Sequence, residues 1–434
     1  MRQAALAERP FRSLTVAVLC GRDSQNRDRK GADRLQDLRN SLLVLLLAVS
    51  PLAAQIAVRS NFEGGAIGKV ETVSPSHVRI GVPGQADVDK RNRQASWYYF
   101  ELSNALRSPV TVELTEIAGE YDYRAPAYAI TKNTRPVYSY DNTNWTHFAD
   151  DQISWSPEGL TIRFTPERSR VWIAHVPPYT NRHLAALLDA HRGSRFLTRE
   201  TIGKTVEGRE MLLLTITNPA IADTGKKVLW LMFRQHAWES GSSWVGEGAI
   251  RFLLSSDPAA VRLRDAAIWK IFPMADPDGV AAGRVRYNAN GYDLNRNWDT
   301  AEPGKMPEIS AQRKAVLGWV DSGRRVDFFL SLHNTESGEY LQAPVAFRDL
   351  GERALDLLKT RTTFNPTVPL RESPATADPG RMTVSQGLYH DRKIPSMLME
   401  QMVERNSKLG YCPTVKDRED FGPALVQVLY EAIR

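Results

Sequence analysis

The sequence predicts an α/β fold with a mixed, mostly parallel sheet that is flanked by helices and preceded by a small antiparallel β-sandwich domain. Two observations predict it. Residues 55–178 hold short alternating runs with no long amphipathic helix between them, and from about residue 180 apolar strands alternate with helices. Pro177-Pro178 separates the two patterns. We therefore expect a leader at 1–54, a sandwich domain at 55–179 and an α/β domain at 180–434.

The sandwich domain is predicted by four short runs that are rich in β-branched and aromatic residues. They lie at 96–102 (SWYYFEL), 110–114 (VTVEL), 160–164 (LTIRF) and 171–176 (VWIAHV). Asn and Gly turn signals lie between the runs. Short strands separated by turns are typical of an antiparallel sandwich.

The second domain begins with the clearest strand of the chain, residues 228–233 (VLWLMF). A continuous apolar run of this length is expected of a strand that is buried on both faces of a sheet. The next elements are helix 246–254, strand 267–274, helix 309–322, strand 326–332, strand 395–399 and helix 421–433. This alternation indicates a parallel or mixed sheet with both faces covered.

Charge and cysteine content exclude several classes of protein. The net charge is +6, of which residues 1–54 contribute +4 through nine basic and five acidic side chains. The small remaining excess does not support a nucleic-acid-binding surface. Two cysteines, Cys20 and Cys412, exclude a disulfide scaffold and a cysteine-rich zinc module.

Residues 41–54 (SLLVLLLAVSPLAA) have the order of an export signal, with Arg39 before an apolar run and Ala53-Ala54 after it. The run at 42–49 is too short to span a bilayer, which needs about 20 residues. Cleavage after Ala54 would give a secreted or periplasmic protein with no stable membrane insertion. The alternative is a buried helix of a cytoplasmic protein.

Chemically reactive residues follow three of the predicted strands. His236 and Glu239 follow strand 228–233, His333 follows strand 326–332, and Glu400 follows strand 395–399. Ligands of open α/β sheets bind at the carboxyl ends of the strands, so these side chains should converge. Two histidines, one carboxylate and an open position are typical of catalytic zinc. The HxxE spacing alone is weak evidence, because a histidine at a sheet edge is usually only hydrogen-bonded.

A longer motif follows strand 267–274. It reads ADPDGV at 275–280, then Arg286, then DLNRNW at 293–298. With HxxE before it and His333 and Glu400 after it, this order resembles the zinc metallocarboxypeptidase family typified by carboxypeptidase A. The resemblance spans about residues 180–434 and implies a mixed eight-stranded sheet. Residues 60–65 (SNFEGG) and 97–100 (WYYF) resemble the N-terminal domain of the cytosolic-carboxypeptidase-like branch, whose best known members remove glutamates from protein tails.

The resemblance implies a role for each motif residue. His236, Glu239 and His333 would bind one Zn²⁺ per chain. Glu400 would be the general base that activates the zinc-bound water and the acid that protonates the leaving amine. Arg286 would polarise the scissile carbonyl.

The remaining roles concern the substrate, which would be the C-terminal tail of a peptide or protein. Asn295 and Arg296 match the pair that grips its terminal carboxylate, for which a planar guanidinium is well suited. Arg381, in a Gly-Arg segment before Glu400, would meet an acidic C-terminal side chain, with Arg392 and Lys393 as alternatives. The sequence does not choose between cell-wall peptides and protein tails.

Two departures from the family pattern stand out. Asp276 replaces the usual Asn, and residues 371–388 contain no tyrosine that could cap the substrate carboxylate. Two other functions remain open. One is a zinc deacylase of N-acyl amino acids, similar to succinylglutamate desuccinylase and aspartoacylase, and the other is a non-catalytic zinc-binding or peptide-binding module. The complete DLNRNW segment favours the peptidase, and Glu400 argues against a module that only binds.

Overall fold

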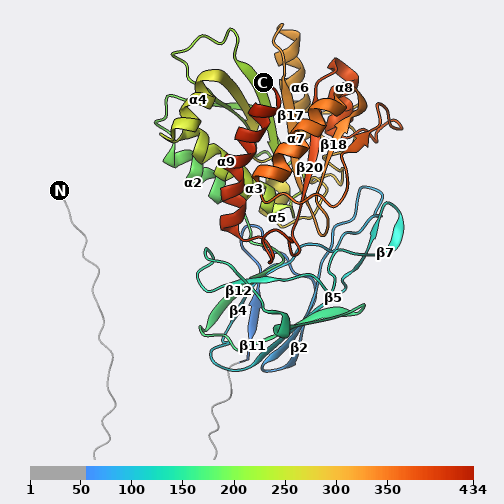
Figure 1. Ribbon diagram of the computed structural model, residues 1–434. Coiled ribbons are helices and arrows are strands. Elements are labelled where there is room, and N and C mark those ends of the chain that lie inside the picture. Colours follow the sequence, from blue (N-terminus) through green and yellow to red (C-terminus); the bar gives the residue numbers. More distant parts are fainter. Residues whose placement is uncertain (1–54) are drawn as a thin grey trace, which may run out of the picture. The chain divides into compact units, whose positions relative to one another are not determined.

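The fold was analysed in a computed structural model that describes residues 55–434. The predicted export signal at 41–54 lies outside the described residues. The described chain forms one compact unit with a β-rich N-terminal part and an α/β part (Figure 1). None of the helices within 55–434 is long and apolar enough to cross a membrane.

The N-terminal part is a sandwich of two five-stranded sheets. One sheet has the order β1 (Ala57–Arg59), β4 (Tyr99–Ser103), β12 (Arg170–Ala174), β8 (Val137–Ser139) and β9 (Thr146–His147). The other has the order β10 (Ile153–Ser156), β11 (Gly159–Phe164), β5 (Val110–Thr115), β3 (His77–Gly81) and β2 (Val70–Ser74). Their inward-facing residues, such as Phe100, Val112 and Ile162, form one buried core.

The prediction that this sandwich is antiparallel is wrong for one pair of strands. β3 and β5 run parallel, with Val78 opposite Val112. The reason is topological, because the intervening strand β4 lies in the other sheet and the chain returns beside β3 in the same direction. A separate hairpin, β6 (Ala118–Tyr121) and β7 (Arg124–Tyr128), follows β5.

The α/β part contains a mixed eight-stranded sheet, which confirms the predicted fold class. Its strand order is β13 (Leu197–Lys204), β14 (Glu210–Ile216), β16 (Ala267–Phe272), β15 (Lys227–Phe233), β17 (Phe328–Thr335), β20 (Ser396–Met402), β18 (Tyr340–Pro344) and β19 (Arg371–Ser373). The four central strands, β16, β15, β17 and β20, are parallel to one another. They are also the four strands that the sequence predicts.

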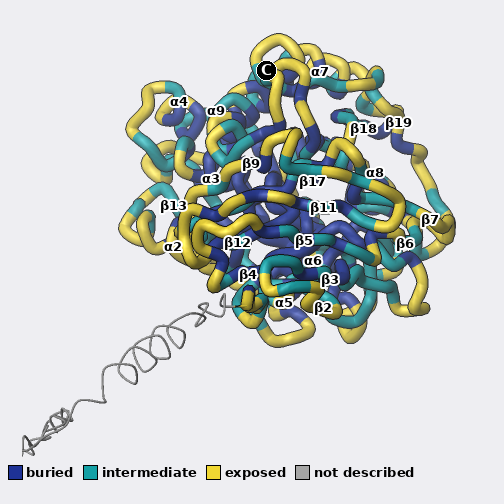
Figure 2. Tube along the Cα trace, turned by 90° about the horizontal axis from the view of Figure 1, so that it is seen from below, coloured by how far each residue is buried: buried dark blue, intermediate teal, exposed yellow. Residues whose placement is uncertain are grey.

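Helices cover both faces of this sheet. They are α2 (Asn181–Ala190), α3 (Ser240–Leu254), α4 (Pro258–Ala266), α5 (Pro277–Ala282), α6 (Pro307–Asp321), α7 (Arg348–Arg361), α8 (Val384–Arg392) and α9 (Val415–Ala432). Helices α2, α3, α7 and α9 share one core with the sheet, and α6 and α8 share another. Figure 2 shows the result, with buried stretches along the central strands and exposed stretches on the outer helices and loops.

Helices α3 and α9 pack so closely that glycine is required at their contact. A Cβ added to Gly422 would lie 2.3 Å from the backbone nitrogen of Ala249, and one added to Gly248 would lie 2.0 Å from the carbonyl oxygen of Glu419. Backbone atoms cannot rotate away as a side chain can. The position of α3, which begins directly after Glu239, therefore depends on the absence of side chains at this crossing.

Gly422→Ala should lower the free energy of unfolding by roughly 1–3 kcal/mol, the usual cost of forcing an extra methyl group into a packed interior. Gly318→Ala on α6 is the control, because a Cβ there would meet no atom within 4 Å. The control should gain up to about 1 kcal/mol from helix propensity. Urea denaturation of both variants measures the difference. Equal stability would show that α3 and α9 can separate without cost.

Candidate active site

The candidate active site lies at the carboxyl ends of three neighbouring parallel strands, β15, β17 and β20. His236 and Glu239 lie in the turn that leads from β15 into α3. His333 is on β17 and is paired in register with Glu400 on β20. The structure thus brings together the four residues that the sequence places at strand ends.

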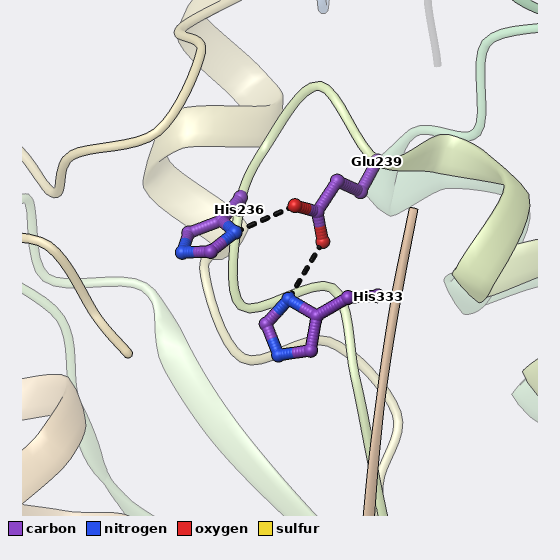
Figure 3. Close-up of side chains that lie close together, drawn as sticks. All are labelled: His236, Glu239 and His333. Carbon is purple, nitrogen blue, oxygen red and sulfur yellow. Dashed lines mark hydrogen bonds and ion pairs between the residues drawn. The ribbon is translucent and has the colours of Figure 1, made fainter. Parts of the chain in front are cut away.

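His236, Glu239 and His333 are buried and face one another (Figure 3). The Nδ1 atom of His236 is 2.6 Å from one carboxylate oxygen of Glu239, and that of His333 is 2.9 Å from the other. One ligand atom from each residue lies within 4.8 Å of the other two. Three donors at this spacing can surround one metal ion.

The outer ring nitrogens show that this donor set fits a metal. His236 Nε2 lies 3.1 Å from an oxygen of Asp293, and His333 Nε2 lies 2.9 Å from Gln235 Oε1. An imidazole that donates from Nε2 has its lone pair on Nδ1, where a metal can be bound. Two such lone pairs then converge on one carboxylate, an arrangement that a cation between them would satisfy. Two nitrogens and one carboxylate are the usual protein ligands of catalytic zinc.

The pKa values of two carboxylates at the site, those of Glu239 and Asp293, are strongly lowered. Burial by itself would raise the pKa of Glu239, but the two imidazoles outweigh it and hold that pKa at about 2. Burial likewise opposes ionisation of Asp293, while Arg286 and His236 keep the pKa of Asp293 well below its ordinary value. Both carboxylates are therefore negative at neutral pH, as ligands and partners of a cation must be.

The pKa of Glu400 is shifted in the opposite direction. Burial raises its pKa well above the ordinary value, the negative charge of Glu239 adds to the rise, and Arg286 opposes it. Its Oε2 atom is buried and makes no hydrogen bond within the described residues. A carboxylate in this state can exchange a proton with a group that enters the site.

Arg286 is held beside the metal ligands by Asp293. Its Nε donates to Asp293 Oδ2 at 2.7 Å, while the other oxygen of the same carboxylate faces His236. The guanidinium also lies 5.5 Å from the centre of the Tyr121 ring, which belongs to hairpin β6–β7 of the N-terminal part.

A cavity of about 220 Å³ brings together three of the predicted arginines, Arg286, Arg296 and Arg381. The cavity also contains Asp122, whose Oδ1 is 3.4 Å from Arg381 Nη2. Asn295 is not among its lining residues. Its amide oxygen accepts a hydrogen bond from the backbone of Val384 at 2.9 Å, and its Nδ2 lies 3.5 Å from His333 Nε2.

The two alternatives to Arg381 lie elsewhere. Arg392 is paired with Asp321 at 2.8 Å, and the ammonium of Lys393 lies 4.6 Å from the centre of the Tyr389 ring. Neither residue lines the cavity that contains the three arginines. Among the three candidates, only Arg381 occupies a position from which it can reach a substrate in that cavity.

A second cavity of about 320 Å³ adjoins the first, with Tyr121 and Arg286 lining both. It contains Glu239 and Glu400 together with Tyr340, which is opposite Glu400 in the pairing of β18 and β20. Its other wall comes from the N-terminal part, including residues 93–96. The metal ligands therefore face a cleft that both parts of the chain build.

Sequence reasoning missed several residues of the site. Asp293 begins the DLNRNW motif, but its side chain received no role there. Gln235 directly precedes His236 and also accepts a hydrogen bond from Ser331 at 2.7 Å. Tyr340 lies in a strand that the sequence does not predict. The signal for Asp293 was its position in the motif, whereas Tyr340 had no local signal.

Each of the two parts of the chain matches a known protein family. Residues 58–176 match the cytosolic carboxypeptidase N-terminal domain, and residues 184–340 match the zinc carboxypeptidase family. Cytosolic carboxypeptidase 2 of Macaca fascicularis is 30% identical over 271 residues, which cover 56% of this chain and 31% of that protein. Cytosolic carboxypeptidase 6 of Mus musculus is 28% identical over 336 residues, covering 73% and 60% respectively. The chain thus spans about a third of the length of the first relative and about three fifths of the second.

Solved structures agree as well. The crystal structure of a metallo-carboxypeptidase from Burkholderia cenocepacia superposes with a TM-score of 0.75 and 25% sequence identity. The match covers 87% of this chain and 99% of that one, so it includes the sandwich as well as the α/β part. The resemblance found in the sequence and the predicted fold are both confirmed.

Asp293→Asn should weaken zinc binding by about 10–100-fold, the usual effect of neutralising a residue that supports a metal ligand. The amide oxygen can still accept from His236 Nε2, so the loss measures the negative charge. Competition with a chromogenic chelator gives the affinity. Asp321→Asn, which removes an exposed ion pair with Arg392, is the control and should bind zinc normally. Unchanged affinity in Asp293→Asn would remove this residue from the metal site.

Proposed function

Because this chain belongs to the zinc carboxypeptidase family, we propose that it is a metallocarboxypeptidase that removes the C-terminal residue from peptides or protein tails. The observation that carries the proposal is a juxtaposition. A three-residue metal site, a glutamate with a buried oxygen that makes no hydrogen bond within residues 55–434, and a cavity with three arginines lie side by side. Each supplies one requirement of C-terminal hydrolysis.

His236, Glu239 and His333 would hold the zinc ion. When bound, zinc polarises a substrate carbonyl and lowers the pKa of a water molecule to about 7. The buried setting strengthens every charge interaction around the ligands. Asp293 and Gln235 keep both imidazoles in the tautomer that leaves Nδ1 free.

Glu400 takes a proton from the attacking water and returns it to the nitrogen of the leaving amino acid. Its raised pKa suits both steps, since it makes the carboxylate a stronger base for taking up the proton, and the resulting carboxyl group can then give that proton up. The unpaired Oε2 atom supplies the position for that proton. Arg286, whose guanidinium is fixed by Asp293, stabilises the negative charge that develops on the scissile carbonyl oxygen.

Arg296 would grip the terminal carboxylate of the substrate, because it lines the cavity next to Arg286. A guanidinium can bind a carboxylate with two parallel hydrogen bonds. The predicted share of Asn295 in this grip stays a prediction. It requires the amide group to turn away from Val384 and His333 toward the cavity.

We further propose a preference for acidic C-terminal residues, with Arg381 as the group that meets the acidic side chain. Arg381 lines the same cavity as Arg296, and its partner there is Asp122. The ion pair with Asp122 is largely exposed and therefore weak. A substrate carboxylate can therefore take the place of Asp122 as the partner of Arg381.

Two further assignments belong to this proposal. We propose a domain boundary between residues 179 and 180, and the stretch between β12, which ends at Ala174, and α2, which begins at Asn181, supports it. The relatives are named cytosolic carboxypeptidases, which favours the cytoplasmic alternative over the predicted export.

Incubation of zinc-loaded protein with free peptides ending in Glu, Asp, Lys, Phe and Leu tests the activity, with mass spectrometry as the readout. Amidated copies of the peptides and an N-acetylated amino acid complete the panel. Stepwise loss of C-terminal residues from free peptides alone is expected. Hydrolysis of only the acetylated amino acid would instead establish the deacylase. Binding of zinc without turnover of any of them would indicate the non-catalytic module.

Glu400→Gln should keep one zinc per chain and lose about 10²–10⁴-fold in kcat, because glutamine cannot transfer the proton. Glu247→Gln is the matched control, since Glu247 is a buried glutamate that pairs with Arg251 on α3. Metal analysis and peptide hydrolysis are measured on the same samples. Loss of zinc from Glu400→Gln would mean that Glu400 is a ligand or a structural residue.

Arg381→Met should lower kcat/KM for peptides ending in Glu by about tenfold relative to peptides ending in Leu, the value of one partly exposed charge-assisted hydrogen bond. Arg392→Met removes an arginine outside the cavity and should leave the ratio unchanged. If both variants keep the same ratio as the parent protein, Arg381 does not read the side chain.

A further inference from the structure

The segment 283–293 carries both Arg286 and Asp293 and lies against the N-terminal sandwich. Residues 285–287 have no place in a helix or a regular strand of the eight-stranded sheet. Their backbone groups therefore find partners outside it, as buried backbone groups must.

Gln85, from the N-terminal part, supplies most of these partners. Its Oε1 accepts hydrogen bonds from the backbone N–H groups of Val285, Arg286 and Tyr287, at 3.0, 2.8 and 2.9 Å. Its Nε2 donates to the carbonyl oxygen of Tyr287 at 2.8 Å. One side chain thus binds four backbone groups of three consecutive residues, with Arg286 in the middle.

Gln85 is itself fixed. Its backbone N–H and carbonyl pair with those of Gln94, at 3.0 and 3.1 Å. The far end of the segment is fixed as well, because Val88 donates to the carbonyl oxygen of Gly291 at 3.0 Å. Gly291 has a φ of +86° and a Cβ there would lie 2.7 Å from the Val88 nitrogen, so only glycine fits. Both anchors belong to residues 85–88 of the sandwich.

The guanidinium of Arg286 is therefore placed from two directions. Asp293 holds its Nε, and Gln85 holds the backbone from which the side chain extends. A shift of the backbone would break the fit to Asp293 or carry Asp293 away from His236. Displacements of about 1 Å at a reacting centre can cost on the order of 10²-fold in rate.

We propose that Gln85 is a positioning residue for the reaction, through which the N-terminal domain sets the location of Arg286 relative to the metal ligands. This inference rests on the proposed function, because it gives Arg286 its role at the scissile carbonyl. It makes the sandwich a part of the catalytic apparatus rather than an appended domain.

Gln85→Met tests the proposal, since methionine has a similar length and cannot form these hydrogen bonds. Hydrogen–deuterium exchange followed by mass spectrometry should show faster exchange in peptides that contain residues 285–287 and no change in β15 or β17. In peptide hydrolysis, kcat should fall by about 10–100-fold while KM and zinc content stay near those of the parent. Gln85→Glu keeps an acceptor for the three N–H groups but sets a carboxylate oxygen against the carbonyl oxygen of Tyr287, so it should recover only part of the loss.

Thr131→Val is the matched control. Thr131 also bridges the two parts of the chain, through a 2.9 Å hydrogen bond to Glu404, but it makes no contact with the Arg286 segment among the hydrogen bonds of residues 55–434. It should leave kcat unchanged. In an Arg286→Ala background, Gln85→Met should cause no further loss, because a positioning residue acts only through the group that it places.

Unchanged exchange at residues 285–287 in Gln85→Met would overturn the proposal whether or not the protein hydrolyses peptides. An additive loss in the double variant would overturn it as well. Failure of the parent protein to hydrolyse any peptide would remove the proposed function, and the exchange experiment would still decide whether Gln85 holds the segment.

Discussion

The candidate site depends on the two contacts that the carboxylate of Asp293 makes. One of its oxygens faces a nitrogen of His236 and the other accepts from Arg286, so a residue of the candidate metal site and the neighbouring arginine share one partner. Burial of a lone carboxylate would be costly, but Arg286 and His236 beside it hold the pKa of Asp293 well below its ordinary value. The position of Arg286 relative to His236 is thereby set by one carboxylate. The remaining residues are arranged around this pair by the carboxyl ends of β15, β17 and β20.

In the α/β part, the strands that the sequence reveals are those that are buried on both faces. Strand β15 is a continuous apolar run, and β16, β17 and β20 are similar, so all four could be predicted. Strand β13 is mostly exposed and β19 has only three residues, and neither has a hydrophobic pattern that separates it from a loop. The parallel pairing of β3 with β5 depends on which sheet β4 joins, a property that no local pattern records.

The residues of the candidate site likewise fall into those that the sequence predicts and those that it does not. His236, Glu239, His333 and Glu400 could be predicted because strand ends and motif order mark them. Gln85 could not, since a single glutamine in a loop of another domain has no signal until the fold brings it against residues 285–287. The same is true of Tyr121 and Asp122, which reach the arginine cavity from the hairpin region of the sandwich. Contacts between domains far apart in sequence are the least visible part of a site.

The crossing of α3 and α9 has a consequence for the life of the protein in the cell. Helix α3 follows directly from Glu239, yet α9, which packs against it, is made later than the other helices and strands of residues 55–434. A ribosome that has made the metal ligands has therefore not yet made the support that keeps their helix in place. We expect the metal site to become stable only once α9 has been made. A nascent chain that stops short of α9 would expose an apolar face of α3 and become a substrate for chaperones and proteases.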